Sequence, residues 1–483
     1  MTKITFHITA SNQCVLAFFL LLSLGNLAGC TANTDATVTT NAASDSQSQL
    51  SSLAIDNVWS GHRIKPYLLT RGKNQFVAYF DSNRQMTVAH RLLGKPWRYY
   101  KVDSWLGWDS HNYVTMELDS AGHLHVMGNM HGDAIEYFRT TVPMQVRSLK
   151  RVASMVNLSQ EQRMTYPVFL LNKDNQLILK YRDGGSGNGN EIYNIYDSQA
   201  QKWSRLHGNT FLDGEGKMSG YFEGPIKGPD GHFHLIWVWR NTPNAATNHS
   251  LSYAKSPDLI HWSDSQGKPL ALPITLKATE VVDPVPPFAG MINGNVKLGF
   301  DRDRRPIISY HKYDASGNTQ MYVARQEGKH WKSVQISDWQ DFRWDFSGPG
   351  SLGKFPIKPQ SPTLRNDGNI GVIVRKHEQV MQFVLDPDTL APIRVEDVNI
   401  YPPEIESLTE KANALLIDKA LKPLEHNVFI GAGDTSSTDS KFYLSWHSQS
   451  GNRDRAHDSI SLPSVLLLHE VSYERRVRIS SGR

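Results

Sequence analysis

The stretch DGHFHLIWVWRNTPNAATNHSLSYAKSPDLIHW, residues 230–262, holds one copy of the sequence unit that decides the fold. The unit starts at an Asp-Gly turn, continues as an apolar strand, and is followed by a second strand that carries Tyr253. It closes with Trp262. Apolar side chains recur at period two in short runs bounded by turn residues, which indicates strands and not helices.

This unit recurs along the chain. Similar turns lie at Asp119–Gly122, Asp301–Asp303 and Asn366–Gly368, and the closing tryptophans are Trp97, Trp203, Trp262 and Trp331. The last three stand about 60 to 70 residues apart, and two units separate the first two. Since about 430 residues follow the N-terminal segment, the spacing predicts an all-β fold, a seven-bladed β-propeller of four-stranded antiparallel blades.

A two-sheet sandwich with an additional domain is the alternative architecture. It is disfavoured because no linker divides residues 55–475. The single convincing helical pattern covers residues 404–421. A propeller gathers its loops around a central channel, so we expect the functional residues on loops of several blades at one end of that channel.

The N-terminus has the features of an export signal. Lys3 precedes the apolar run Val15–Leu24, and Leu27-Ala28-Gly29-Cys30 matches a lipoprotein box. We therefore expect a signal peptide over residues 1–30 with lipidation of Cys30, a flexible Ser/Thr/Asn-rich tether over 31–52, and the catalytic propeller over 53–483. The Thr that follows Cys30 favours an outer-membrane or cell-surface lipoprotein, anchored or released.

Composition narrows the function classes. The two cysteines, Cys14 and Cys30, both lie in the export segment, so the folded part has no disulfide and no thiolate nucleophile or metal ligand. Charges are nearly balanced, with 51 Lys and Arg against 47 Asp and Glu, which gives no case for nucleic acid. The 12 Trp and 18 Tyr suit stacking on sugar rings. We expect a monomer.

Two histidine motifs flank one predicted blade. They are Gly107-Trp108-Asp109-Ser110-His111-Asn112-Tyr113 and Gly128-Asn129-Met130-His131. Each histidine lies at a strand-loop boundary close to an asparagine, from which its side chain can reach the channel mouth. A single loop histidine is usually solvated surface, but two on consecutive loops indicate a functional site.

The next unit adds a tyrosine and an arginine. Tyr166 lies in Met164-Thr165-Tyr166-Pro167, and Arg182 precedes a glycine-rich run, residues 184–189. One turn separates their strands, so the two side chains can lie side by side. The glycine-rich run lacks the lysine and helix of a phosphate loop, and we interpret it as a tight loop that leaves room for a bulky ligand. Tyr221 and Arg240 are second-rank candidates.

Together these motifs resemble those of the seven-bladed, BNR-repeat-containing ulvan lyases, polysaccharide lyase families 24 and 25. The spacing from His111 to His131 and from Tyr166 to Arg182 is closer to family 25. The resemblance covers residues 58–471 and is specific in the first three blades. It implies an endo-acting lyase that cleaves ulvan, a sulfated rhamnose–uronate polymer, at O4 of a uronic acid by β-elimination.

The resemblance also assigns roles to residues. His111, Tyr166 and Arg182 would carry the chemistry, and His131 and Tyr221 would line the site. Asn112, Asn129 and Arg240 are further expected substrate contacts. No cofactor is needed for the reaction, although related propellers can hold a structural divalent cation, for which the sequence shows no clear ligand set.

The residue types suit this reaction. Loss of the C5 proton places negative charge on the uronate carboxylate, which a cation such as Arg182 must neutralise. Glucuronate has H5 and O4 on one ring face, so Tyr166 could act as base and acid, provided that its pKa is lowered. Iduronate has them on opposite faces, which would make His111 the base and Tyr166 the acid.

Two other functions remain open. A sialidase-like glycoside hydrolase is suggested by Ser256–Trp262, which is similar to an Asp-box turn, but such enzymes need an acidic pair or a tyrosine with an acidic partner. A non-catalytic glycan-binding lipoprotein would need the aromatic surfaces alone.

Overall fold

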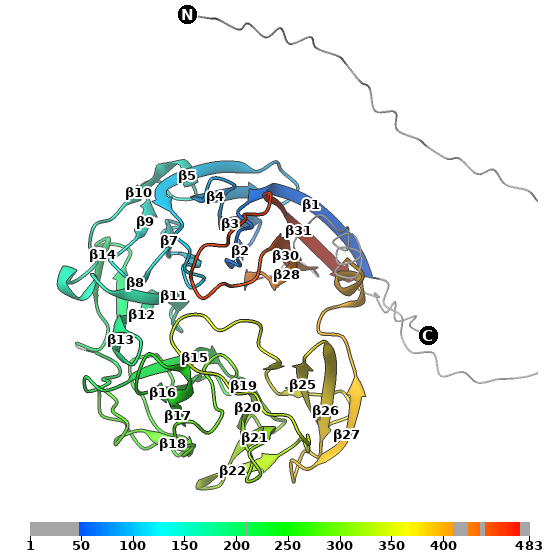
Figure 1. The fold of residues 1–483 in the computed structure, drawn as a ribbon. Helices are drawn as coiled ribbons and strands as arrows, with labels where there is room; N and C mark the ends of the chain where they lie inside the picture. The colour runs from blue at the N-terminus through cyan, green and yellow to red at the C-terminus, as the bar shows by residue number, and fades with distance from the viewer. Residues whose placement is uncertain (1–47, 209, 409–423, 435–439, 474–483) are drawn as a thin grey trace, which may run out of the picture. The chain divides into compact units, whose positions relative to one another are not determined.

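The computed structural model describes residues 48–208, 210–408, 424–434 and 440–473. These residues belong to one compact unit, 47–483. Their strands form seven sheets of four or five strands, arranged one after another around a ring (Figure 1). All neighbouring strands pair antiparallel except β2 and β29. This confirms the predicted all-β fold of four-stranded antiparallel sheets, and the number of sheets is consistent with seven blades.

The sheets are numbered here from the N-terminal side, with strands given from the inner to the outer edge. Sheet 1 contains β29 (Ala432–Asp434), β2 (Tyr67–Arg71), β3 (Asn74–Phe80), β4 (Gln85–Leu92) and β5 (Arg98–Trp105). Sheet 2 contains β6 (Val114–Leu118), β7 (Leu124–Gly128), β9 (Tyr137–Thr140) and β10 (Leu149–Arg151). Sheet 3 contains β8 (His131–Asp133), β11 (Met164–Leu171), β12 (Leu177–Gly185), β13 (Asn188–Asp197) and β14 (Lys202–Arg205).

The second half of the chain continues the pattern. Sheet 4 contains β15 (Ser219–Lys227), β16 (Phe233–Arg240), β17 (Asn248–Ser256) and β18 (Glu280–Asp283). Sheet 5 contains β19 (Lys297–Phe300), β20 (Pro306–Tyr313), β21 (Thr319–Glu327) and β22 (His330–Gln335). Sheet 6 contains β23 (Ile357–Pro359) and β24 (Thr363–Leu364), then β25 (Ile370–Lys376), β26 (Gln379–Leu385) and β27 (Pro392–Asp397). Sheet 7 contains β28 (Glu425–Ile430), β30 (Ser440–Ser448), β31 (Ser464–Tyr473) and β1 (Ser48–Val58).

Helical structure is scarce in the described part of the chain. Three short 3-10 turns occur, η1 (Val146–Ser148), η2 (Leu158–Gln160) and η3 (Ala245–Thr247). Residues 403–408 are helical, and the remainder of the helix predicted over 404–421, residues 409–421, lies outside the described residues. Among the described residues, no helix is long and apolar enough to cross a membrane.

An aspartate stabilises the turn between the first and second strands in at least two of the sheets. In sheet 2 the Asp119 carboxylate accepts backbone N–H groups of Ala121 and His123, and in sheet 4 Asp230 accepts that of His232. Each aspartate also bonds a histidine of the second strand: His125 Nε2 lies 3.3 Å from Asp119, and His234 Nε2 lies 2.9 Å from Asp230. These Asx turns fix the hairpins that the Asp-Gly motifs predicted.

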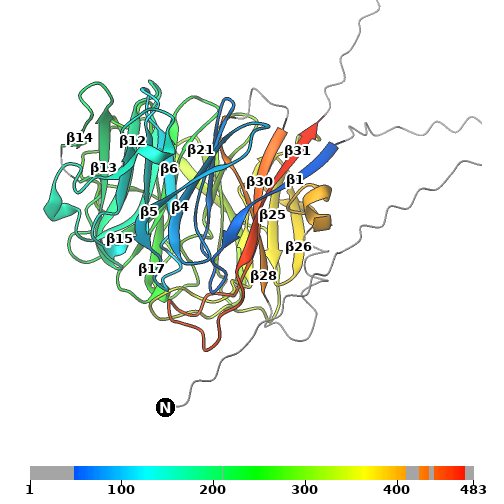
Figure 2. The same cartoon turned by 90° about the horizontal axis from the view of Figure 1, so that it is seen from above.

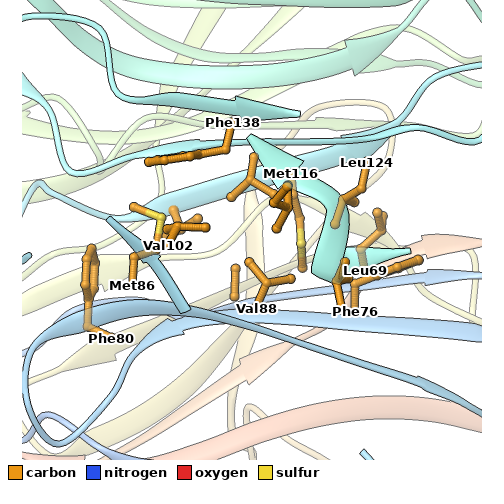
Figure 3. Close-up of a cluster of buried hydrophobic side chains, with 14 of the residues drawn as sticks. Leu69, Phe76, Phe80, Met86, Val88, Val102, Met116, Leu124 and Phe138 are labelled. Carbon is orange, nitrogen blue, oxygen red and sulfur yellow. The ribbon is translucent and has the colours of Figure 1, made fainter. Parts of the chain in front are cut away.

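The core lies between the faces of neighbouring sheets. Figure 3 shows the contact of sheets 1 and 2, where Phe76 and Val88 meet Met116 and Phe138, all at most 2% exposed. Each such side chain contributes about 1.5–3 kcal/mol when it is removed from water. A strand that lies between two such contacts is buried on both faces, as every residue of β16 is. Turned by 90°, the strands of the sheets run between two ends at which the loops gather (Figure 2).

The N-terminal strand corrects the predicted boundary of the tether. β1 begins at Ser48 and pairs with β31 from Ser48↔Tyr473 to Val58↔Ser464, so residues 48–52 belong to sheet 7. Ser52 Oγ lies 2.7 Å from His469 Nδ1. The polar composition of this segment hid a strand at the outer edge of a sheet, where one face is exposed to water. The predicted signal peptide, Cys30 and residues 31–47 of the tether lie outside the described residues.

This pairing gives a first prediction. A chain that starts at Leu53 should unfold at a lower temperature than one that starts at Ser48, because it loses five strand pairs, the Ser52–His469 hydrogen bond and the packing of Leu50 on Val471. We expect a cost of about 2 kcal/mol. Thermal unfolding followed by circular dichroism measures this cost. If the two chains unfold at the same temperature, the folded domain starts after residue 52, as the sequence predicted.

Candidate active site

Three consecutive sheets bring the predicted site residues together. His111 lies in the loop before β6 of sheet 2, and His131 starts β8, which pairs with β11 at the inner edge of sheet 3. Tyr166 and Arg182 lie in β11 and β12 of the same sheet. Tyr221 is in β15 of sheet 4. The β8 strand explains the meeting of the two histidine motifs, because it carries His131 out of sheet 2 and beside Thr165.

Asp109 holds both histidines. Its Oδ1 lies 2.7 Å from His111 Nδ1, and its Oδ2 lies 2.5 Å from His131 Nδ1. The two imidazoles stack with their centroids 4.2 Å apart. Burial opposes the charge of Asp109, but the hydrogen bonds from His111 and His131 outweigh it and hold the pKa of this carboxyl below its usual range. The carboxylate is thus ionised at neutral pH.

This geometry fixes the tautomers of the histidines. An ionised carboxylate can only accept hydrogen bonds, so both Nδ1 atoms must carry the proton. In a neutral imidazole the Nε2 atom then keeps its lone pair, which can accept a proton from a substrate. The side chains of His111 and His131 are 26% and 20% exposed, so both can be reached from the channel.

The same three residues are also the candidate metal ligands of the described structure. Asp109, His111 and His131 each offer one ligand atom, and these atoms lie within 4.8 Å of one another. Mixed nitrogen and carboxylate ligands suit a divalent transition metal. Both Nδ1 atoms hydrogen-bond to the carboxylate, so an ion at this place would have to replace these hydrogen bonds or be bound through the Nε2 atoms.

Tyr166 is turned toward the histidines by a β-bulge. The pairing of β11 with β12 shifts between Thr165↔Arg182 and Val168↔Lys180, so β11 has one extra residue at this point. Tyr166 itself has φ 55°, in the left-handed region. Bulges of this kind re-aim a side chain. The Tyr166 ring centroid lies 5.9 Å from that of His111 and 5.8 Å from that of His131.

The environment of Tyr166 keeps its phenol protonated. Burial raises the pKa of Tyr166, and the neighbouring Tyr221 adds to the rise, while the charges of Arg182 and Arg240 lower it in part. The net direction is upward. The sequence argument required a lowered pKa for Tyr166 to act as a base, and the structure shows the opposite for the free protein, because burial outweighs the two guanidinium charges.

Arg182 is a buried cation that lacks part of its hydrogen bonding. The residue is 2% exposed, and no described residue offers an acceptor to its Nε or Nη1. Its guanidinium carbon lies 5.0 Å from the ring centroid of Tyr166 and 5.5 Å from that of Tyr221. A buried charge with incomplete hydrogen bonding is costly, so a guanidinium held in this way beside two aromatic rings is suited to binding an anion.

The glycine-rich run, residues 184–189, is a tight hairpin, as predicted, but other parts of the protein fill the space beside its glycines. It joins β12 to β13 with Gly185 opposite Asn188. A Cβ on Gly189 would lie 2.9 Å from Arg182 Cδ, and one on Gly187 would lie 2.5 Å from the Thr242 backbone. These glycines therefore make room for Arg182 and for sheet 4, and the interpretation as space for a bulky ligand is wrong at these two positions.

The second-rank residues differ in how they relate to the site. Ser186 Oγ of the hairpin lies 2.6 Å from the Tyr221 hydroxyl, which holds that ring 6.2 Å from Tyr166. Arg240 lies 5.2 Å from the Tyr221 ring and donates to the Pro243 and Asn244 carbonyls. Both line the site from sheet 4, with Arg240 at its edge.

The two asparagines, Asn112 and Asn129, hydrogen-bond to each other, and Asn129 also bonds to sheet 1. Asn112 Nδ2 donates to Asn129 Oδ1 at 3.2 Å, and the Asn129 amide donates to Ser104 Oγ and the Trp105 carbonyl. Asn129 therefore ties the histidine motif to sheet 1. Asn112 Oδ1 is buried and has no hydrogen-bond partner among the described residues.

Two acidic residues of the site were missed at the level of sequence. Asp109 stands inside the first histidine motif, and its position two residues before His111 was a usable signal. Asp454 comes from the loop between β30 and β31 and gave none. Its Oδ1 lies 3.9 Å from His111 Nδ1 and accepts hydrogen bonds from Ser110 and Ser351.

Fold and candidate site together describe a β-propeller protein whose candidate site residues lie on loops and strands of three neighbouring sheets. The family model described as "BNR repeat-containing family member" matches residues 74–339, more than half of the chain. The chain belongs to this BNR repeat-containing family.

Individual relatives match over shorter stretches. "Ulvan lyase, long isoform" of Alteromonas sp is 31% identical over 123 residues, which is 23% of this chain and 12% of that protein. The protein of the same description from Pseudoalteromonas sp. (strain PLSV) is 28% identical over 122 residues, again 23% and 12%. The aligned part thus spans about an eighth of the length of these relatives.

Solved structures share the fold over most of the chain. The polysaccharide lyase Uly1 has a TM-score of 0.58 at 13% identity and covers 90% of this chain and 94% of its own. A family 25 ulvan lyase bound to -[GlcA(1-4)Rha3S]- has a TM-score of 0.55 at 12% identity and covers 86% and 94%. At such identity the likeness concerns the fold.

Proposed function

We propose that this protein is an endo-acting polysaccharide lyase that cleaves ulvan at O4 of a uronic acid by β-elimination and leaves a 4,5-unsaturated uronate. The observation that carries the proposal is the buried Arg182 guanidinium, whose Nε and Nη1 lack acceptors among the described residues and which lies beside a protonated tyrosine and two tautomer-fixed histidines. Ulvan is taken from the relatives named above, one of which binds -[GlcA(1-4)Rha3S]-.

Arg182 would bind the uronate carboxylate. Removal of the C5 proton spreads negative charge onto that carboxylate, and a buried guanidinium whose Nε and Nη1 lack acceptors among the described residues can donate to it and neutralise this charge. The low exposure of the site strengthens this interaction, because water screens it poorly. Arg182 thus lowers the barrier to proton loss as an electrostatic catalyst.

Proton transfer would be divided between His111 and Tyr166. His111 presents a lone pair at Nε2 and can take the C5 proton, while the Tyr166 phenol, protonated in the free protein, can give its proton to the leaving O4. This division suits iduronate, whose H5 and O4 lie on opposite faces. Cleavage of glucuronate by Tyr166 alone requires that substrate binding first deprotonate the phenol. His131, Asn112 and Tyr221 would orient the ring.

We also infer the cellular context from the sequence. The protein would be exported and anchored at the outer membrane or cell surface through a lipid on Cys30, or released, and would act as a monomer without a cofactor. Metabolic labelling with a fatty acid, compared between the full chain and Cys30→Ser, tests the anchor. Label retained in Cys30→Ser would contradict it.

The reaction itself is tested by ultraviolet absorbance. Incubation with ulvan should produce the absorbance of a conjugated unsaturated uronate together with new reducing ends. A hydrolase would raise reducing ends without that absorbance, and a glycan-binding protein would raise neither. Within the described site, Asp109 is bonded on both oxygens to histidines and Asp454 accepts from Ser110 and Ser351, so both carboxylates are engaged and neither is the free carboxylate that a hydrolase would need.

A second prediction concerns Asp109. Asp109→Asn should lower kcat about 10²-fold, because an amide cannot accept from both Nδ1–H groups and the histidines then lose their orientation and tautomer. The rate of unsaturated product formation measures it. Asp454→Asn is the matched control, since Asp454 lies farther from His111 Nδ1, at 3.9 Å, and should lose much less. Equal losses in both variants would contradict the assignment.

A further inference from the structure

A second cavity with a basic lining borders the candidate active site. Its volume is about 700 Å³, and it lies among sheet 6, sheet 7 and the segment that precedes β2. Five cationic side chains line it: Arg63, Lys65, Lys354, Lys358 and Arg375. This basic cavity contains none of the residues to which the elimination chemistry has been assigned.

Positive charge exceeds negative charge in the basic cavity. Glu378 and Glu425 are the carboxylates among its lining residues, against five cations, so the excess is three positive charges. Lys354 Nζ lies 2.5 Å from Glu378 Oε1, which pairs one of each. The lining His426 adds no charge at neutral pH, because burial, with the neighbouring His447 and His469, lowers its pKa to about 4.

Three of the cations form no ion pair with a described residue and rest on aromatic rings instead. The guanidinium carbon of Arg63 and Nζ of Lys65 lie 5.4 and 4.9 Å from the ring centroid of Phe429. Nζ of Lys358 lies 5.7 Å from the centroid of Phe355. The rings hold the charged groups in place without neutralising them.

The lowered pKa values of the lysines in the basic cavity agree with an excess of positive charge that is not neutralised. Burial, together with the charges of Arg63 and Arg375, lowers the pKa of Lys358 to about 8. Burial also lowers the pKa of Lys65, with Arg63 adding to the effect. Like charges gathered in a partly dry cavity repel one another, and a bound anion relieves that repulsion.

Ser110 connects the basic cavity to the active site. It lines the cavity and stands between Asp109 and His111 in the chain. Its Oγ and backbone N–H donate to Asp454 Oδ1 at 3.1 and 3.2 Å, and the nearby Ser450 and Gly451 line the cavity as well. A chain-like ligand that leaves the histidines past Ser110 therefore enters the basic cavity.

We propose that the basic cavity is a second binding site for the same polyanionic glycan, and that it receives sulfate-ester and carboxylate groups of sugar units at a distance from the cleaved bond. The substrate class rests on the proposed function. An extended polymer with an anionic group on successive units matches both the excess of positive charge and the continuity with the active site. A compact phosphate compound would satisfy the charge but would have no reason to reach Ser110.

The experiment measures binding apart from turnover. Isothermal titration with sulfated ulvan oligosaccharides, and with the same oligosaccharides after chemical desulfation, compares three chains, each carrying Tyr166→Phe to prevent cleavage. One has no other change, one adds Lys65→Gln and Lys358→Gln, and the control adds Lys150→Gln and Lys202→Gln. The control removes the same charge from exposed positions on the outer strands β10 and β14.

We expect the Lys65/Lys358 change to weaken binding of sulfated oligosaccharides about tenfold, about 1.4 kcal/mol, because two partly screened charge contacts are lost. Desulfated oligosaccharides should lose clearly less, and the control should bind as the parent does. Equal binding by all three chains overturns the proposal, as does an equal loss in the Lys150/Lys202 control. Inorganic phosphate is titrated into the same three chains as well. A folded Lys65/Lys358 variant that loses phosphate binding but still binds the oligosaccharide also overturns the proposal.

The outcomes separate this inference from the proposed function. If the chain with Tyr166 intact makes no unsaturated product, but the Lys65/Lys358 change still weakens glycan binding selectively, the lyase proposal fails and the second site stands. If unsaturated product forms and the Lys65/Lys358 change leaves binding unaltered, the lyase proposal stands and the second site fails. Thermal unfolding of each variant shows whether it is folded.

Discussion

Tyr166→Phe should lower the rate of unsaturated uronate formation by about 10³-fold, within the 10²- to 10⁴-fold range of general acid catalysis. The substitution removes the phenolic proton that O4 needs and keeps the ring that contacts His111, His131 and the Arg182 guanidinium. The fold should therefore persist, with an unchanged thermal transition. The measurement is the initial rate of ultraviolet absorbance increase on ulvan.

Tyr322→Phe is the control for this change. The Tyr322 hydroxyl lies in sheet 5 and donates to Gln335 at 2.9 Å, away from the site, so its loss should leave the rate unaltered. Substantial activity in a folded Tyr166→Phe chain would mean that another group protonates O4. The imidazolium form of His131, with a proton on Nε2 as well, would then be the first alternative, since its ring stacks on that of His111 and lies 5.8 Å from that of Tyr166.

Arg182→Met should separate activity from stability. Turnover should fall about 10²- to 10³-fold, because the uronate loses the cation that takes up the developing charge. Stability should stay equal or rise, since the guanidinium is buried with Nε and Nη1 unpaired among the described residues and methionine packs against Tyr166 and Tyr221 without that cost. Arg182→Lys should recover part of the rate only, because an ammonium lacks the planar fork.

Lys180→Met gives the contrast two residues earlier in the same strand. Lys180 is buried as well, but its Nζ lies 3.3 Å from Glu191, so its removal leaves a buried carboxylate unpaired. We expect a loss of about 3 kcal/mol in this variant. Thermal unfolding and kinetics of both variants test the pair. A marked loss of stability in Arg182→Met would show that Arg182 is paired in the protein and is not reserved for a ligand.

The local sequence was sufficient to predict those features that depend on interactions between residues close together in the chain. Alternating apolar residues can bury a face only as strands, and an aspartate before a glycine closes a hairpin through its own carboxylate, as Asp119 and Asp230 do. The separation of Tyr166 and Arg182 by one hairpin also placed them on neighbouring strands, where Arg182 pairs with Thr165, the residue before Tyr166. All-β architecture and most of the site followed from such short-range rules.

The tether predicted over 31–52 shows where those rules weaken. Its residues 48–52 look like a linker by composition, yet they pair with β31, more than 400 positions along the chain. A polar outer strand has no hydrophobic pattern of its own, so its partner decides its structure.

The sequence by itself determined the strand pattern, the repeated unit and the residue types of the site, because each depends on neighbours within one hairpin. Only the tertiary structure decided that β8 crosses to sheet 3, that one carboxylate, Asp109, serves two histidines, and that Asp454 joins them from the last sheet. It also decided that burial raises the pKa of Tyr166 and leaves Arg182 without its full set of acceptors. These properties arise from the packing of sheets that are distant in the chain, since desolvation and charge pairing depend on everything within a few ångströms and not on what is adjacent in sequence.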